Sequence, residues 1–333
     1  MNLTNGNKYK GEFKNGMFEG YGIIYNFNEL IYEGEWKNNQ KEGYGILYSG
    51  NRYKYEGEFK NGKREGNGIE YFNDGNKYKG EFKNNNRNGY GIIYYSNGYK
   101  YECELKNNNR DGLGKVYNHN RVSYKGEFKN NFKNGFGIFY YYGKRYKGIF
   151  RYDYRNGYGI EYYKTFKIYE GEWRYDIRNG YGIFYFINGD KYIGEWKNNL
   201  KEGFGILYYS NGNKYEGQWK KDLMEGYGKL YSHDLLKYEG EFKNDKKEGL
   251  GLYYFSNGDI LECEWENGIY NGYGIFNSSL GFKYKGYFKI NLSTKILFTI
   301  YKILLFLNHL YSKVIRNIAT LLLILILILA SRI

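Results

Sequence analysis

A unit of 23 residues repeats along nearly the whole chain. Successive intervals are 23 residues long except one of 22, between Tyr124 and Tyr146. Repetition at this length predicts an array of small stacked units, each of which contacts only its neighbours. Such arrays offer long surfaces and rarely enclose a catalytic pocket. With the first residue of the unit taken as position one, copies begin at Tyr9, Tyr32, Tyr55, Tyr78, Tyr101, Tyr124, Tyr146, Tyr169, Tyr192, Tyr215, Tyr238 and Leu261, with a truncated thirteenth copy at Tyr284.

The copy that begins at Tyr32 has the pattern of two strands joined by a turn. Residues 32–37 alternate an aromatic ring or glycine with a charged side chain, which is the two-residue period of a half-buried strand. A short polar segment follows, and residues 44–48 alternate again. Segments such as Ser96-Asn97-Gly98 supply the turn to the next copy. Each copy is therefore predicted to be a β-hairpin, and its paired glycines disfavour a helix.

Aromatic and glycine residues recur at fixed positions in the unit. Position five is aromatic in every full copy except one, which has Leu105, and positions twelve and fourteen are always glycine. Position seventeen is tyrosine in eleven of twelve full copies. Equivalent rings are expected to form a ladder, with glycine leaving room for them against the backbone. All five tryptophans occupy position five: Trp36, Trp173, Trp196, Trp219 and Trp265.

Charged residues also follow the repeat. Position four is Glu in ten of twelve full copies, and position six is basic in eleven. These rows are interpreted as a solvated face with compensating charge; the alternative is a charged surface for a partner. Position ten carries cations that we expect at the hairpin tips, either as solvated turn residues or as contacts for anionic lipid or an acidic protein. They are Lys41, Arg64, Arg87, Arg110, Lys133, Arg155, Arg178, Lys201 and Lys247.

The net charge of +14 is divided unevenly along the chain. Residues 290–333 carry five basic residues and no acid, and the repeats carry the other 45 basic residues with 36 acidic ones. This excess suits anionic membranes or acidic proteins, whereas no motif supports nucleic-acid binding. Cys103 and Cys263 are seven repeats apart, which at about 4.8 Å per strand places them beyond disulfide reach. Two unpaired thiols and a polar N-terminus without a signal peptide indicate a reducing, cytosolic setting.

The repeated pattern Tyr-x-Gly-Glu-(Trp/Phe)-x(6)-Gly-x-Gly resembles the MORN repeat, the membrane occupation and recognition nexus motif. The resemblance covers about five-sixths of the chain and is specific because the motif recurs in register. Departures are few. Cys103 and Leu105 alter the fifth copy, Leu261 and Cys263 the twelfth, and Ile149 replaces the usual Glu in the seventh. These copies are expected to bend or interrupt the aromatic ladder.

The resemblance implies a fold and a class of function. MORN proteins form single-layered, twisted, elongated antiparallel sheets with a groove, so we expect an all-β fold of about twelve tandem hairpins. The family implies scaffolding, protein binding in the groove and membrane association, and phosphoinositide binding has been proposed for some members. The expected partner is an extended or helical protein segment held mainly by aromatic contacts. Candidate groove residues are Tyr32, Trp36, Tyr169, Trp173, Tyr192, Trp196, Tyr215, Trp219 and Trp265.

The composition changes abruptly after the repeats. Residues 295–311 have apolar side chains at helical spacing, and a nearly continuous apolar run follows. As a helix, Val314 to Ala330 would span about 25 Å. Three interpretations remain open: a C-terminal membrane anchor, a helix that packs in the groove of the array, and a gene-model artefact. The upstream cations Lys302, Lys313 and Arg316 favour leaving the repeats in the cytosol if the segment is an anchor.

Three parts are therefore expected: a polar N-terminus at 1–8, the repeat array at 9–289 and a helical hydrophobic tail at 290–333. No dinucleotide fingerprint or P-loop surrounds the repeated Gly-x-Gly, and the three histidines are isolated. We therefore expect no enzyme, cofactor or metal site. The leading hypothesis is a non-catalytic scaffold held at a membrane or membrane-associated cytoskeleton. The alternatives are a soluble, dimeric assembly protein with its tail helix packed in the groove, and a regulatory subunit of a lipid kinase.

Overall fold

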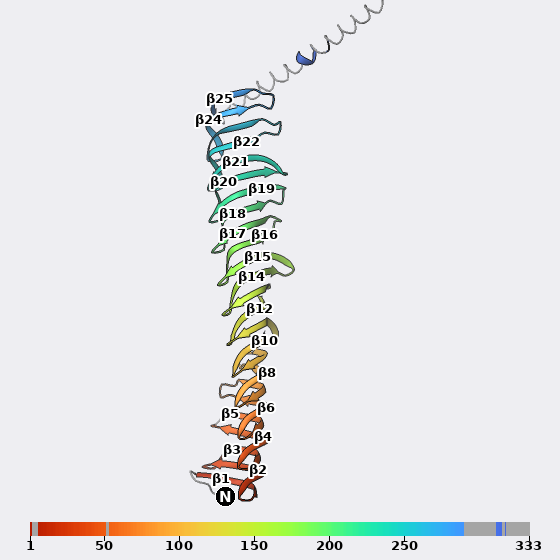
Figure 1. Ribbon diagram of the computed structural model, residues 1–333, viewed down its shortest axis with the longest axis vertical. Helices are drawn as coiled ribbons and strands as arrows, with labels where there is room; N and C mark the ends of the chain where they lie inside the picture. Colours follow the sequence, from red (N-terminus) through yellow and green to blue (C-terminus); the bar gives the residue numbers. More distant parts are fainter. Residues whose placement is uncertain (2–5, 51–52, 290–310, 315–316, 318–333) are drawn as a thin grey trace, which may run out of the picture. The chain divides into compact units, whose positions relative to one another are not determined.

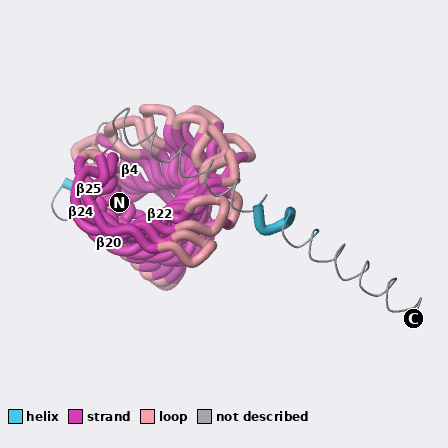
Figure 2. The backbone as a smooth tube through the Cα atoms, turned by 90° about the horizontal axis from the view of Figure 1, so that it is seen from above, coloured by secondary structure: helices cyan, strands magenta, loops and turns pink. Residues whose placement is uncertain are grey.

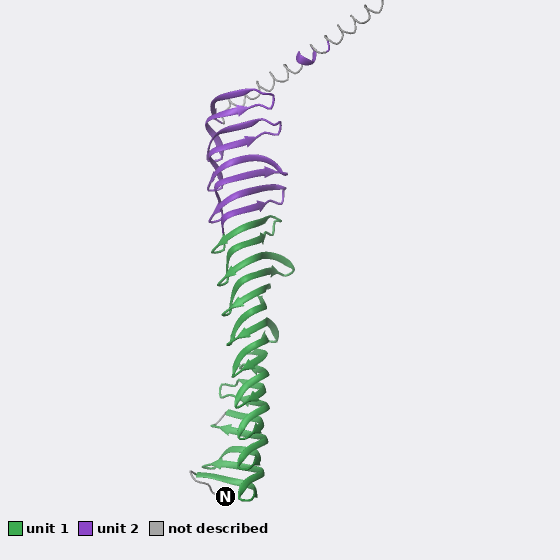
Figure 3. Cartoon of the chain, viewed as in Figure 1, with its two compact units in different colours: residues 1–200 green, residues 201–333 purple. Residues whose placement is uncertain are grey.

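The computed structural model describes residues 1, 6–50, 53–289, 311–314 and 317. The chain divides into two compact units, Met1–Leu200 and Lys201–Ile333 (Figure 3). Within the described residues the fold is all-β apart from Gly6, which lies in a 3₁₀ turn, and residues 311–314 and 317, which are α-helical. The rest of the predicted helical tail, including nearly all of Val314 to Ala330, lies outside the described residues. In the described part of the chain, no helix is long and apolar enough to cross a membrane.

The first unit is an antiparallel sheet in which each strand pairs with the next along the chain (Figure 1). Strands therefore follow one another in sequence order, as consecutive hairpins require. The strands are β1 (Asn7–Lys14), β2 (Met17–Asn26), β3 (Glu29–Lys37), β4 (Gln40–Ser49), β5 (Tyr53–Lys60), β6 (Lys63–Tyr71), β7 (Lys77–Lys83), β8 (Asn86–Tyr94), β9 (Tyr99–Lys106), β10 (Asn109–Asn118), β11 (Arg121–Lys129), β12 (Phe132–Tyr141), β13 (Lys144–Arg151), β14 (Tyr154–Tyr163), β15 (Phe166–Arg174), β16 (Ile177–Tyr185) and β17 (Lys191–Lys197).

The second unit has the same antiparallel order of neighbouring strands. Viewed along the stack, the strands are bent into arcs (Figure 2). The predicted hairpin pattern is thus confirmed in both units. The strands are β18 (Leu200–Tyr208), which begins at the boundary, β19 (Asn213–Lys220), β20 (Leu223–Ser232), β21 (Leu235–Lys243), β22 (Lys246–Tyr254), β23 (Ile260–Glu266), β24 (Ile269–Asn277) and β25 (Lys283–Lys289).

The register assigns the repeat positions to the two faces of the sheet. In the second copy Tyr32 pairs with Leu47, Gly34 with Gly45 and Trp36 with Lys41. Because directly paired residues share a face, positions one, three, five, ten, fourteen and sixteen lie together. We call this side the tyrosine face. Positions two, thirteen, fifteen and seventeen lie on the opposite face.

Asparagine forms the tight turns within hairpins. Asn38 and Asn39 have φ of +48° and +65°, the left-handed region that asparagine and glycine enter most readily. The Asn39 side chain also accepts a hydrogen bond from the backbone N–H of Phe18 in the preceding copy (2.7 Å). Asn85 makes the equivalent bond to Arg64 (2.8 Å). Position eight therefore both shapes its own turn and ties that turn to the one before it.

Glutamate at position four supports a bulge in several hairpins. The register shifts between Gly34 and Trp36, so several backbone groups of β4 face a single residue of β3. Glu35 Oε1 accepts a hydrogen bond from the backbone N–H of Tyr44 in this widened stretch (3.0 Å). The same bond recurs in other copies. The acidic row at position four is therefore part of the fold, in addition to facing solvent.

The 22-residue copy loses its residue at a junction between hairpins. In the neighbouring junction of β14 and β15, the register shifts between Glu161 and Tyr162, which marks a bulge. The junction of β12 and β13 turns through Tyr142 and Gly143, and its register continues without a shift. One residue fewer therefore removes a bulge, and the pairing of the flanking strands is preserved.

Candidate binding surfaces

The aromatic residues predicted to line a partner groove form the core of the sheet. Tyr32 is 0% exposed, and its hydroxyl donates to the carbonyl of Glu35 (3.1 Å). Its ring lies against Gly45, where an added Cβ would come within 2.3 Å of the hydroxyl oxygen. Trp36 is 6% exposed, meets Tyr32 edge to face at 5.1 Å, and donates from Nε1 to the carbonyl of Gly22.

The other candidate groove residues have the same environment. The candidate tyrosines at position one are 0% exposed, and the candidate tryptophans at position five are 4–6% exposed. The physical reason is the glycine pair, because a residue without a side chain lets each ring rest flat on the backbone. These rings therefore present almost no surface to a partner, contrary to the expected groove. The residues concerned are Tyr32, Trp36, Tyr169, Trp173, Tyr192, Trp196, Tyr215, Trp219 and Trp265.

The cations at position ten lie in strands, immediately after the turn and not at its tip. Lys41 is the second residue of β4, and its Nζ lies 4.9 Å from the ring centroid of Tyr32. Lys201 Nζ lies 3.9 Å from the ring centroid of Trp219. Burial lowers the pKa of both amines, and it lowers that of Lys247 to about 8. The expectation of exposed tips is therefore corrected: a two-residue turn leaves position ten on the tyrosine face, over the rings.

The arginines of this row have the same placement. Arg64, Arg87, Arg110, Arg155 and Arg178 each lie within 6 Å of at least one aromatic centroid, and so does Lys133. Cation–π contacts at this distance favour the charged form. Contact of this row with lipid stays a prediction.

Two buried carboxylates join parts of the basic row. Glu70, at position sixteen, is 5% exposed. It accepts hydrogen bonds from Tyr53 Oη (2.7 Å), Arg64 Nη1 (2.7 Å) and Arg87 Nε (3.0 Å). One carboxylate thus neutralises two guanidinium groups from successive copies. A buried charge is stable only with partners of this kind.

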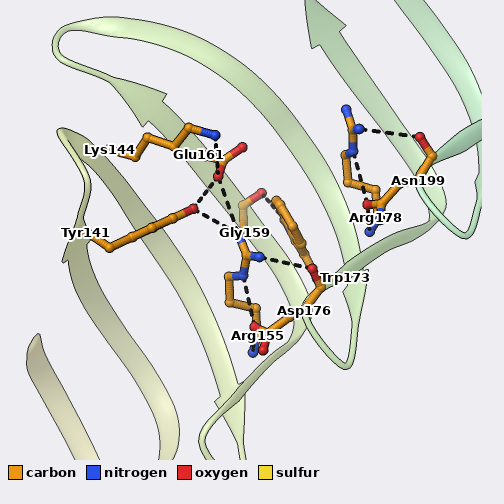
Figure 4. Close-up of polar contacts among 9 residues, drawn as sticks. All are labelled: Tyr141, Lys144, Arg155, Gly159, Glu161, Trp173, Asp176, Arg178 and Asn199. Atoms are coloured by element: carbon orange, nitrogen blue, oxygen red, sulfur yellow. Dashed lines mark hydrogen bonds and ion pairs between the residues drawn. The ribbon is translucent and has the colours of Figure 1, made fainter.

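The second carboxylate is Glu161, at the same repeat position (Figure 4). It accepts a hydrogen bond from the Tyr141 hydroxyl and lies 3.4 Å from Arg155 Nη1 and 3.7 Å from Lys144 Nζ. Arg155 also stacks over Trp173, with 4.0 Å from its guanidinium carbon to the ring centroid. Both carboxylates therefore lie on the tyrosine face, and each pairs with at least one position-ten cation.

In each unit, a row of exposed large apolar residues lies on the opposite face, at position thirteen between the two glycines. We call it the exposed aromatic row. Its members are 44–74% exposed. The sequence contained this signal, because aromatic residues recur at the position. The row consists of Tyr21, Tyr44, Tyr90, Leu113, Phe136, Tyr158 and Tyr181 in the first unit, and Phe204, Tyr227, Leu250 and Tyr273 in the second.

The third copy interrupts this row, because Asn67 occupies its position thirteen. A cavity of about 480 Å³ opens at this gap, between Tyr44 and Tyr90. Its floor includes Gly68 and Ile92, and Glu56, Lys79 and Glu81 contribute polar groups. We call this cavity the Asn67 notch. It combines an apolar floor with charged side chains at its rim.

A larger cavity lies on the tyrosine face at the fifth and sixth copies, with a volume of about 820 Å³. Cys103 replaces the usual glycine at position three there and is 0% exposed. An added Cβ on Gly114 would meet the Cys103 Cβ at 2.6 Å, so the thiol side chain occupies the space taken by a tyrosine ring in other copies. Tyr101 is therefore only partly buried and lines the cavity.

The two cysteines are buried and free. Burial raises the pKa of Cys103 to about 11 and that of Cys263 to about 12, which keeps both as thiols at neutral pH. Among the described residues, no three His, Cys, Asp or Glu side chains are grouped so as to hold a metal ion.

Comparison with known proteins gives one strong relationship. The MORN repeat family model matches eleven segments that together exceed half of the chain. No curated protein sequence matches the chain significantly. Among solved structures, BamB from Moraxella catarrhalis is 8% identical over 74% of this chain and 88% of its own, with a TM-score of 0.14, too low to indicate a shared fold.

The matched segments follow the copies identified from the repeat. They are residues 9–26, 32–52, 55–77, 78–98, 124–143, 146–165, 169–191, 192–214, 215–234, 238–260 and 264–279. The fifth copy, with Cys103 and Leu105, falls between matches. The register of matches, the paired glycines and the antiparallel hairpins agree, and the chain belongs to the MORN-repeat family.

Proposed function

We propose that this protein is a non-catalytic scaffold that binds a protein partner along the exposed aromatic row. The observation that carries the proposal is the Asn67 notch, a cavity of about 480 Å³ bounded by two half-exposed tyrosines. Large exposed aromatic residues around a pocket are typical of protein-binding sites, because they bury much area at small cost in side-chain entropy. The tyrosine face is less suited to this role because its rings are already packed.

The spacing of the row defines the shape of partner that fits. Each copy adds two strands, so successive members of the row are about 10 Å apart. A helix brings an equivalent side chain back to the same face every seven residues, or about 10.5 Å. The proposed partner is therefore an elongated segment with apolar side chains at this interval, one of which enters the Asn67 notch. Rim residues Glu56 and Lys79 would set its polar contacts.

Filling the notch tests this proposal. Asn67→Tyr restores the residue type of most other copies, so it is expected to leave the fold intact while it excludes the partner's side chain. A photo-crosslinking amino acid at position 90 should give a discrete protein adduct in cells, and Asn67→Tyr should reduce its yield at least about tenfold. Phe27→Ser is the matched control, since it removes an aromatic residue that is 79% exposed but lies in a turn outside the row.

Tyr44→Ser, which removes a tyrosine that lines the notch, should lower the adduct yield as well. Equal adduct yields from both variants and the wild-type chain would reject the row as the binding surface. Loss of adduct in the Phe27→Ser control as well would show that the effect is not specific to the row. Circular dichroism of each variant confirms that the sheet is retained.

We also propose that the apolar segment Val314 to Ala330 holds the repeats at a membrane. The support is its sequence, which is mostly apolar, is preceded by Lys302 and Lys313, and carries Arg316 close to its start. A chain that ends at Lys289 should be released by an alkaline carbonate wash of cell membranes, whereas the longer chain should remain in the pellet. Release of both forms would contradict the anchor and favour the assembly-protein alternative.

A further inference from the structure

The cavity at the fifth and sixth copies has a basic lining. Its lining includes Arg110, Arg121 and Lys133, with Asp153 as the only carboxylate among the lining residues. In the described part of the chain, no ion pair within 4 Å joins any of the three cations to a carboxylate. Asp153 instead accepts a hydrogen bond from the backbone N–H of Lys133 (2.8 Å).

Two other copies of the first unit hold a carboxylate that this place lacks. Position sixteen is Glu70 in the third copy and Glu161 in the seventh. Glu70 pairs with Arg64 and Arg87, and Glu161 pairs with Arg155 and Lys144. In the fifth copy position sixteen is Val116, which is 5% exposed and lines the cavity. Arg110 and Lys133 are the position-ten cations on either side of it in the repeat.

The two cations are held in place without being neutralised. Arg110 Nη2 donates to the carbonyl of Asn131 (2.6 Å), and its guanidinium lies 4.3 Å from the ring centroid of Tyr101. Lys133 Nζ lies 4.8 Å from the centroid of Phe139. Burial is the largest influence on the pKa of Lys133 and lowers it; the charges of Asp153 and Asp176 raise it, and the charge of Arg110 lowers it to a smaller extent. A carboxylate in the cavity would give Arg110 and Lys133 a direct ion-pair partner.

The walls and size of the cavity determine what can carry that carboxylate. Tyr99, Tyr101, Phe128, Phe139 and Tyr141 surround the cations. A volume of about 820 Å³, open to solvent, exceeds the space needed by a single inorganic anion and accommodates several side chains. Carboxylate recognition between aromatic walls suits a peptide that alternates acidic and aromatic residues.

We propose that this cavity binds an acidic segment of a protein, whose Asp or Glu carboxylate takes the place that Glu70 and Glu161 occupy in their copies. Arg110 and Lys133 bind the carboxylate, and Arg121 attracts further acidic residues of the segment. The aromatic rings of the cavity pack against apolar side chains next to the bound carboxylate in the segment. The site lies on the tyrosine face, so it is separate from the exposed aromatic row and does not depend on the function proposed for that row.

The test uses the full chain and a fluorescein-labelled peptide, Gly-Phe-Glu-Tyr-Glu-Phe-Gly, with a neutral counterpart in which glutamine replaces both glutamates. Fluorescence anisotropy should show binding of the acidic peptide that weakens with salt, and binding at least about tenfold weaker for the neutral one. Arg110→Gln combined with Lys133→Gln should weaken binding by at least about tenfold. Lys41→Gln should not, since Lys41 belongs to the same row but lies outside this cavity.

A second variant tests the site in the opposite direction. Val116→Glu places a carboxylate where Glu70 and Glu161 stand in other copies, so it should fold and should abolish binding of the acidic peptide. This variant decides the question if the double glutamine variant does not fold. Equal binding of the acidic and neutral peptides, or undiminished binding to Val116→Glu, would overturn the proposal. Competition by inorganic phosphate beyond that of sodium chloride at equal ionic strength would show a small-anion site and would also overturn it.

Discussion

Raising the pH above 10 is expected to unfold the repeats in a single steep transition. The cause is the set of buried tyrosines at position one. Burial is the largest influence on eight of them and raises each pKa far above its ordinary value of 10.0; they are Tyr32, Tyr55, Tyr78, Tyr124, Tyr146, Tyr169, Tyr215 and Tyr238.

The sign of the effect follows from proton binding in the two states. Above pH 10 an unfolded chain loses its phenolic protons, whereas the folded chain keeps them, so stability falls as the pH rises. Below pH 10 both states are protonated and the contribution is constant. Each phenol costs about 1.4 kcal/mol for one pH unit above its unfolded pKa. Eight phenols together cost about 11 kcal/mol at pH 11, which is similar to the whole stability of a typical domain.

Circular dichroism and tyrosinate absorbance measured on the same samples check this expectation. Exposed tyrosines such as Tyr142, which is 97% exposed, should ionise first, and the buried ones should ionise together with loss of the strand signal. Tyr142→Phe should leave the transition unchanged. Tyr78→Phe should move it to higher pH once its lower starting stability, about 1 kcal/mol for the lost hydrogen bond to Glu81, is taken into account. Ionisation of all tyrosines near pH 10 with the sheet intact would contradict the argument.

Gly171→Ala is expected to be among the most damaging additions of a single methyl group in the first unit. A Cβ at this position would lie 2.5 Å from the Cα of Gly182 and 2.6 Å from the carbonyl oxygen of Tyr181. Both are backbone atoms of the paired strand, so no side chain can move aside. The Tyr169 hydroxyl, 2.7 Å away, blocks the remaining space. We expect a loss of about 3 kcal/mol or more in the free energy of unfolding, at the upper end for overpacked positions.

The matched control is Gly62→Asn, in a turn of the same unit. Gly62 has φ of +76° and no atom within 4 Å of an added Cβ, and other copies place asparagine at this position, as in Asn39 and Asn85. Its free energy of unfolding should change by no more than about 0.5 kcal/mol. Urea denaturation of both variants measures the difference. A similar small effect in both would show that the two strands separate easily at the glycine pair.

The sequence predicted the repeating hairpins because strand periodicity and turn residues are local properties. It also predicted that glycine leaves room for the rings against the backbone, but it still assigned Tyr32 and Trp36 to an open groove. How completely these rings are buried depends on the bending of the strands and on the contact of each ring with glycines of the paired strand. When the burial of an aromatic residue is unknown, its recurrence in the sequence can be interpreted as a sign of partner binding. The Asn67 notch could have been found, since its asparagine interrupts a row visible in the sequence.

Two further differences have equally specific causes. Lys41 was expected at a hairpin tip because the polar segment around it is longer than the turn itself. The actual turn uses only Asn38 and Asn39, so the lysine returns to the strand. Glu35 was expected to face solvent, and its bond to the backbone of Tyr44 depends on a bulge, which no residue spacing reveals. Register irregularities are tertiary features, and they decide the surroundings of individual side chains.

The junction at Tyr142 and Gly143 has a consequence for how a gene of this kind can change. The β12–β13 junction is one residue shorter than the β14–β15 junction and lacks its bulge, yet the strands on both sides keep their partners. A deletion of one residue within a strand would instead move the side chains in the remainder of that strand to the opposite face of the sheet. Inherited length differences between copies should therefore accumulate at such junctions, and engineered insertions of single residues should be tolerated there and nowhere inside the strands.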